Sequence, residues 1–195
     1  MATVRKLRSA KQVPIYLLRI QLLHVVPAVW RKVLVPGSIK LNKLHSVLLN
    51  VMGWEGGHLH EFIFEQGHYG TPDPYYPDVD AEVQDDTKIT LAKALGPFAS
   101  FTYLYDFGDG WEHIVTIDEI YPPDPEFRHP KCVDGQNACP PEDVGGPWGY
   151  QDFLEAISNT KHENHKEMME WCGGAFNPQQ FDLTGVNEIF SGANN

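Results

Sequence analysis

The sequence predicts an α+β fold: a single-domain roll with a mainly antiparallel or mixed sheet, one N-terminal helix packed on it and short C-terminal helices. Two observations support this prediction. Several segments alternate apolar and polar residues, as half-buried strands do, whereas one segment between them repeats apolar residues at helical spacing. The strand segments are residues 14–23, 28–35, 58–65 and 101–120, and the helical segment is residues 41–52.

The chain is long enough to form one substantial core. It has 195 residues, of which 42% are hydrophobic and 21% are charged, as is usual for globular domains. We expect one domain over residues 1–195, with residues 1–12 flexible and residues 121–149 forming a long Pro-rich loop. The most apolar segment, residues 14–30, is interrupted by Arg19 and other breaks, so we expect it in the core and not in a membrane.

The first half opens with a predicted hairpin of residues 14–23 and 28–35, joined by a turn at Pro27. The helical segment follows. Ser38 can cap its start with a side-chain oxygen, and Gly53 can end it because glycine readily adopts the left-handed conformation. These elements predict the order strand, strand, helix for the first 53 residues.

The next strand, HLHEFIFEQ, carries two histidines at one end. Alternation places His58 and His60 on one face of this strand. Residues 66–86 are rich in proline and acidic residues, which is typical of an exposed loop. Residues 87–95, TKITLAKAL, predict a short strand edge that continues into one helical turn.

The stretch YDFGDGWEH, residues 105–113, is predicted to join two strands. Asp-Gly is a strong signal for a two-residue hairpin, because a type I′ turn requires positive φ at both central positions. With Asp109 and Gly110 in the turn, Asp106 is expected opposite His113. Such a pair can fix the imidazole tautomer for a general base or a metal ligand, or it can serve the structure alone.

The proline-rich segment 121–149 ends in CPPEDVGGPWGY, which contains the adjacent carboxylates Glu142 and Asp143. A loop of this length is often functional. The alternative is a rigid cover over the sheet edge, with Trp148 and Tyr150 as anchors. Three short helices are expected after it, in QDFLEAIS, HKEMMEWC and VNEIF.

Three cysteines, Cys132, Cys139 and Cys172, are too few for a disulfide framework and leave one thiol over. We expect free thiols and a cytoplasmic protein, since no cleavage site follows an uninterrupted apolar run. A disulfide or metal clip between Cys132 and Cys139 is the alternative interpretation.

Charge is distributed unevenly along the chain. The net charge is −11, yet residues 1–54 contain nine Lys and Arg and no acidic residue, against six basic and 26 acidic residues in the remainder. The two parts can pack as complementary surfaces, or the first can form a basic face for phosphate. Because the basic residues are dispersed and the overall charge repels polyanions, direct binding to duplex DNA is not expected. A membrane partner is not expected either. A protein partner or self-association remains possible on the sequence.

Several motifs together resemble a known family. HLHEF, the FTYLYDFGDGWEH hairpin, CPPEDVGG followed by GY, and NPQQFD are similar to the family named after the third open reading frame of an Agrobacterium root-inducing plasmid. The resemblance runs from about Tyr16 to Phe190. It implies an α+β roll in a largely uncharacterised family, some of whose members are labelled resolvase-like passenger proteins of mobile elements. We find no serine-recombinase nucleophile region with its supporting arginines in this chain.

The resemblance maps motif positions onto the chain without a catalytic role. These positions are His58, His60, Asp106, Asp109, Trp111, His113, Pro140, Pro141, Glu142, Asp143, Gly145, Gly146 and Tyr150. Familiar enzyme motifs are absent from the sequence, among them GxxxxGK[ST], GxGxxG, GxSxG and HExxH.

Two classes of function therefore fit the sequence. The first is a cytoplasmic binding or accessory protein, associated with plasmids or mobile elements, with a polar pocket rich in His and Asp. The second is a metal-dependent or acid–base enzyme, hydrolase-like, using His58, His60, Asp106 and His113. The candidate pocket comprises His58, His60, Asp106, Asp109, His113, Glu142 and Asp143. Within it, His58, His60 and His113 are candidate ligands for a zinc-like divalent metal.

Overall fold

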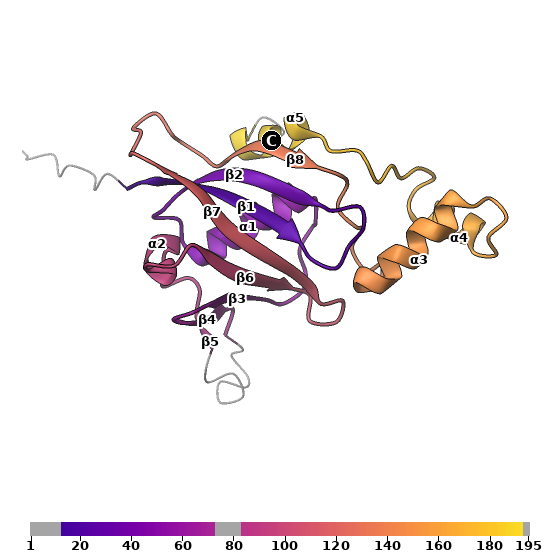
Figure 1. The fold of residues 1–195 in the computed structure, drawn as a ribbon, viewed down its shortest axis with the longest axis horizontal. Helices are drawn as coiled ribbons and strands as arrows, with labels where there is room; N and C mark the ends of the chain where they lie inside the picture. The colour runs from indigo at the N-terminus through magenta and orange to yellow at the C-terminus, as the bar shows by residue number, and fades with distance from the viewer. Residues whose placement is uncertain (1–12, 73–82, 193–195) are drawn as a thin grey trace, which may run out of the picture.

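The computed structural model describes residues 13–72 and 83–192; residues 1–12, expected to be flexible, lie outside this range. Within it, eight strands form one mainly antiparallel sheet in the order β5-β4-β3-β6-β7-β1-β2-β8, accompanied by five helices (Figure 1). The predicted α+β class is confirmed. The strands are β1 (Ile15–Leu22), β2 (Trp30–Pro36), β3 (His60–Phe64), β4 (Gly67–Gly70), β5 (Val83–Asp85), β6 (Ser100–Tyr105), β7 (Trp111–Tyr121) and β8 (Lys131–Gln136). The helices are α1 (Leu41–Met52), α2 (Leu91–Leu95), α3 (Gly146–Ser158), α4 (His165–Trp171) and α5 (Leu183–Ser191).

The opening hairpin is confirmed. β1 and β2 pair antiparallel, with Leu18 opposite Val33, and both side chains are fully buried. β1 also pairs with β7, where Leu22 lies opposite His113. The end of β1 therefore lies beside the start of β7, at the end of the sheet where the candidate site is found.

α1 is the predicted helix, and its apolar stripe is buried in the core. The expected cap at Ser38 is wrong: the helix begins after Lys40, and no side chain caps it. A backbone partner replaces the cap, because the amide of Leu41 donates to the carbonyl oxygen of Ile89 at 3.2 Å. The end is confirmed, since Gly53 adopts the left-handed conformation there.

β3 pairs with β6 in the centre of the sheet, with His60 opposite Tyr105 and Phe62 opposite Tyr103. The buried face of β3 is the one that carries His60, Phe62 and Phe64, as alternation predicts. Residues directly opposite each other point to the same face. These aromatic rings therefore share one layer of the core, and His60 belongs to that layer.

The register predicted for the β6–β7 hairpin is wrong. Tyr103, and not Asp106, lies opposite His113. The connection contains five residues, 106–110, because Asp106 takes a left-handed conformation with φ of 56° and its carbonyl oxygen accepts from the amide of Gly110 at 2.6 Å. Asp106 thus leaves the ladder, and the two-residue turn at Asp109 does not form.

Residues 121–149 are not one continuous loop, because β8 lies inside them and pairs antiparallel with β2. Only Cys132 in this strand is buried, so the sequence shows no alternation there. The prolines flank the strand and therefore remove no amide from its ladder. The predicted loop 66–86 likewise contains β4 and β5, whose glycines and acidic residues weaken the strand signal, while its residues 73–82 lie outside the described range.

The three C-terminal helices are confirmed. Figure 1 shows α3 and α4 beyond the end of the sheet near the β6–β7 connection, whereas α5 lies against β8. Asn187 of α5 joins them by accepting from the amide of Cys132 at 3.0 Å and donating to its carbonyl oxygen at 2.8 Å. In the part of the chain that the structure describes, no helix is long and apolar enough to span a membrane.

Candidate functional site at His58

Two connections meet at one end of the sheet because of strand pairing. Since β3 starts opposite the end of β6, the residues just before β3 lie beside those just after β6. The amide of Asp106 donates to the carbonyl oxygen of Leu59 at 2.9 Å and fixes this neighbourhood. His58 and Asp106, 48 positions apart in the sequence, are therefore brought together by backbone contacts.

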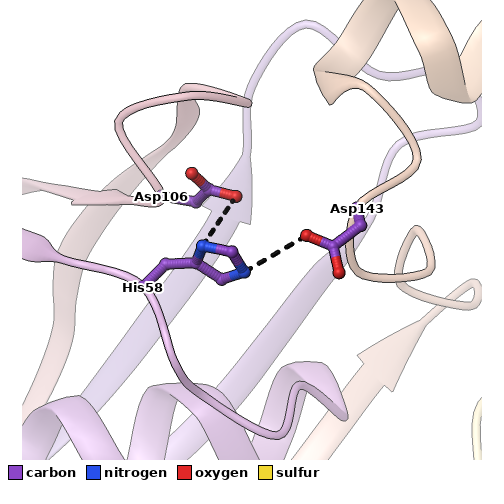
Figure 2. Close-up of side chains that lie close together, drawn as sticks. All are labelled: His58, Asp106 and Asp143. Carbon is purple, nitrogen blue, oxygen red and sulfur yellow. Dashed lines mark ion pairs between the residues drawn. The ribbon is translucent and has the colours of Figure 1, made fainter.

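The imidazole of His58 lies between two carboxylates (Figure 2). Its Nδ1 is 3.5 Å from an oxygen of Asp106, and its Nε2 is 3.2 Å from an oxygen of Asp143. The Asp106 side chain is 11% exposed, that of His58 35% and that of Asp143 72%. The site thus runs from a buried carboxylate, through the ring, to an exposed carboxylate.

Asp106 is held in place by its own loop. One carboxylate oxygen accepts from the amides of Gly108 at 2.9 Å and Asp109 at 3.3 Å, and the other faces His58. Hydrogen bonds of this local type stabilise turns in which an aspartate adopts a left-handed conformation. The side chain therefore has a structural partner on one oxygen and the imidazole on the other.

Glu142 fastens the loop that carries Asp143 to the sheet. Its carboxylate accepts from the hydroxyl of Tyr105 at 2.5 Å and from the amides of Glu55 at 2.8 Å and Gly56 at 3.3 Å. Burial, followed by the hydrogen bond to Glu142, raises the pKa of Tyr105 well above its ordinary value. Glu142 is thus a member of the predicted pocket whose contacts position its neighbour.

The same loop is fixed a second time at Asp109. The carboxylate of Asp109 accepts from the amide of Gly145 at 3.2 Å. Gly146 packs so closely on the hairpin that a Cβ atom would overlap the carbonyl oxygen of Asp109. The β6–β7 connection and the start of α3 therefore form one tightly packed unit beside His58.

His60 belongs to a different, buried polar cluster. Its Nε2 lies 2.9 Å from a carboxylate oxygen of Asp86, and its ring stacks on His45 with centroids 3.6 Å apart. His45 in turn lies 2.7 Å from the hydroxyl of Tyr103. Burial, and then the neighbouring His60, lowers the pKa of His45 to about 4. His60 and His58 thus face separate partners, although they are two positions apart.

His113 is a core residue. It is fully buried, its Nδ1 donates to the carbonyl oxygen of Tyr103 at 3.1 Å, and its ring meets Trp54 edge-on with centroids 5.5 Å apart. Burial lowers its pKa to about 4. Among the described residues its Nε2 has no hydrogen-bond partner. The ring is therefore neutral at pH 7 and lies among aromatic side chains.

The structure brings together one part of the predicted pocket. Within residues 13–72 and 83–192, one group of three side chains has the spacing to share a metal ion. It consists of His58, Asp106 and Asp143, whose ligand atoms lie within 4.8 Å of one another. The structure does not bring His58, His60 and His113 around a single ion. His58, Asp106 and Asp143 were all candidates from the sequence, but Asp106 was expected opposite His113 and instead lies beside His58.

Sequence reasoning missed the partners of His60. Asp86 was expected in an exposed loop, and His45, which lies partly buried in α1, was not among the candidate residues. Tyr105 was also missed as the donor to Glu142. The pairs His45–His60, His60–Asp86 and Tyr105–Glu142 are 15 to 37 positions apart in the sequence. No local sequence pattern therefore indicates that their members are in contact.

Comparison with known proteins agrees with the fold and identifies the family. The model of the family "Plasmid pRiA4b ORF-3-like protein" matches residues 14–185. The chain belongs to this family, and the resemblance seen in the motifs is confirmed.

Two relatives illustrate how far the similarity extends. The chain is 43% identical over 158 residues to the uncharacterized protein y4hQ of Sinorhizobium fredii, covering 81% of this chain and 80% of that protein. Its fold is similar to that of the protein of unknown function MM3350 from Methanosarcina mazei Go1, with a TM-score of 0.79 and 30% identity over 88% of this chain and 96% of the other. MM3350 shares the architecture, and neither protein's description names an activity.

Proposed function

We propose that this protein is a binding or accessory module associated with plasmids or other mobile elements, and that its His58 site binds a divalent metal ion such as zinc. One observation supports the site above all: an imidazole with a buried carboxylate at one ring nitrogen and an exposed carboxylate at the other. The association with plasmids is supported by the description of the family.

The donor set suits a divalent ion. Two ligands bound at about 2.1 Å to one tetrahedral ion lie about 3.4 Å apart, and His58 Nε2 lies 3.2 Å from Asp143. Asp106 lies 3.5 Å from Nδ1, on the side of the ring where carboxylates orient metal-ligating histidines. The remaining positions on the ion stay open for water or for a group of a partner.

Elemental analysis of protein purified without an affinity tag tests this proposal. Zinc, manganese, nickel or iron should bind, and the melting temperature should rise with added metal, because a ligand that binds only the folded state stabilises it. His58→Ala and Asp143→Asn should abolish the rise. His129→Ala, which removes an exposed imidazole elsewhere, should leave it unchanged. Wild-type protein that neither contains nor is stabilised by any of these metals contradicts the proposal.

An acid–base enzyme is the second candidate, favoured by the placement of Asp106 at Nδ1 of His58. A carboxylate at Nδ1 favours the tautomer with the proton on Nδ1, in which Nε2 can take a proton. It supports His58 and Asp106 of the predicted catalytic set, whereas His60 and His113 have buried partners of their own. Turnover of generic ester or phosphoester substrates that is lost in His58→Gln would support it, and equal turnover in both proteins would exclude it.

A cytoplasmic location belongs to the same proposal. Cys132, Cys139 and Cys172 are all free thiols, which is usual in reducing compartments. Thiol counting on denatured, unreduced protein from a native source should give three thiols per chain, and a disulfide between Cys132 and Cys139 would contradict this assignment.

A further inference from the structure

A second feature lies beside the His58 site. A cavity of about 590 Å³ is lined by His24, Asp109, Gly110, Pro147 and Trp148. It lies between the β1–β2 connection, the β6–β7 connection and the start of α3. None of the contacts described at His58 uses Trp148, so the cavity presents a separate surface.

The indole of Trp148 is the most exposed large hydrophobic side chain described, at 86%. In the alternative interpretation of the loop, Trp148 and Tyr150 were expected to anchor a rigid cover over the sheet edge. Tyr150 is such an anchor, since it is fully buried, but Trp148 turns outward. Burying an aromatic ring is strongly favourable, so a ring held in water on an ordered segment is typical of a contact site.

The backbone under Trp148 is firmly held. Gly145 donates to Asp109, and Gly146 packs directly against the carbonyl oxygen of the same residue. The indole is therefore presented next to the Asp109 carboxylate at low cost in conformational entropy. Such preorganised aromatic groups commonly dominate binding energy at interfaces.

The acidic side chains around the cavity favour a positively charged ligand. No Lys or Arg occurs in residues 44–87, 94–127 and 132–160, which contain Asp109 of the cavity and the acids Asp106, Glu112 and Asp143 of the neighbouring connections. Glu112 lies 3.5 Å from His24, which also lines the cavity. An exposed aromatic face beside carboxylates attracts a cation, by cation–π interaction with the ring and by charge with the acids. The acidic surface opposes nucleic acid.

We propose that the cavity between Trp148 and Asp109 binds a basic segment of a partner protein, with an arginine guanidinium stacked on the indole of Trp148 and paired with Asp109. Arginine fits better than lysine because its planar group stacks on an aromatic face while donating to a carboxylate. Phe107 on the β6–β7 connection and Val26 on the β1–β2 connection are each more than half exposed. They give further apolar contacts to such a segment. The proposal does not depend on metal binding at His58.

Fluorescence polarisation with a labelled eight-residue arginine peptide, near 0.15 M salt, tests the proposal. Trp148→Ala should weaken binding about tenfold, as expected for a desolvated cation–π contact, whereas Trp148→Phe should keep most of it. Asp109→Asn should also weaken binding while its side-chain oxygen still accepts from Gly145. An oligolysine peptide of equal charge should bind less tightly than oligoarginine.

The control for general charge attraction is Glu167→Gln, which removes an exposed acid on α4 and should leave the affinity unchanged. Because Trp148 is exposed, Trp148→Ala should melt within a degree or two of the wild type, which separates loss of contact from loss of fold. Equal affinities for wild type, Trp148→Ala and Asp109→Asn would overturn the proposal, as would a wild type that does not bind the peptide.

Discussion

The hydroxyl of Tyr105 donates to the carboxylate of Glu142 at 2.5 Å and so connects the last residue of β6 to the loop before α3. The same carboxylate accepts two amides of the connection between α1 and β3. One side chain thus holds together the segments that carry His58, Asp106 and Asp143. The candidate site depends on this bond, although the hydrogen bonds of Glu142 go to Tyr105, Glu55 and Gly56 and not to His58.

Tyr105→Phe should therefore lower the free energy of unfolding by about 1–3 kcal/mol, because it leaves a charged acceptor without its donor. The change should also weaken metal binding at His58, since the Asp143 loop is less firmly held. Denaturant titration and metal titration measure the two effects. Tyr121→Phe, which removes a solvent-exposed hydroxyl beside Glu119, is the matched control and should leave stability nearly unchanged.

The buried imidazole of His113 predicts a pH dependence of stability. Its pKa falls from 6.5 to about 4 in the folded protein, so the unfolded chain binds the proton more tightly. The free energy of unfolding is therefore highest above pH 6.5. As the pH falls toward 4, it decreases by roughly 3 kcal/mol because of His113. His45 shifts in the same direction. Urea unfolding between pH 7 and pH 4 should show this loss.

His113→Gln is the variant that isolates the effect. It should be less stable than the wild type at pH 7, because it disturbs the packing beside Trp54, yet its stability should change less between pH 6.5 and pH 4. An unchanged slope would show that other groups cause the dependence. Asp85, whose pKa is lowered to about 2 first by its hydrogen bond with Lys88, contributes only below pH 4 and does not confuse the comparison.

Asp106 has a structural and a site role that two substitutions can separate. Asp106→Asn keeps an acceptor for the amides of Gly108 and Asp109 and tolerates the left-handed backbone. It should retain most of the stability but lose metal affinity. Asp106→Ala removes the acceptor as well and should cost a further 1–2 kcal/mol or so of unfolding free energy. Equal metal affinity in wild type and Asp106→Asn would remove Asp106 from the site.

Gly146→Ala tests the tight contact between α3 and the hairpin. Gly145 and Gly146 both have left-handed backbone, with φ of 92° and 71°, so alanine costs about 1 kcal/mol of strain at either position. Only at position 146 would the Cβ atom overlap the Asp109 carbonyl. Gly146→Ala should thus destabilise by about 1–3 kcal/mol more than Gly145→Ala, measured by denaturant unfolding. Equal losses would show that the contact has room to relax.

The sequence by itself determined the elements whose burial repeats with a regular period. The opening hairpin, the helix 41–52 and the strands around residues 101–120 each have one buried face, and that face appears as a pattern of apolar residues. The same periodic patterns predicted the fold class, and motifs shared with the family pointed to His58, Asp106 and Asp143 as residues of interest. These are local or family-level signals that require no knowledge of which strands pair.

Only the tertiary structure decided which of those residues meet. His58 reaches Asp106 because β3 pairs with β6, and it reaches Asp143 because Glu142 binds Tyr105. The expected pair of Asp106 with His113 failed because a carboxylate bonded to the amides of its own loop lengthened the turn from two residues to five. Strand order and side-chain-to-backbone hydrogen bonds join residues far apart in the chain, and no periodic pattern records them.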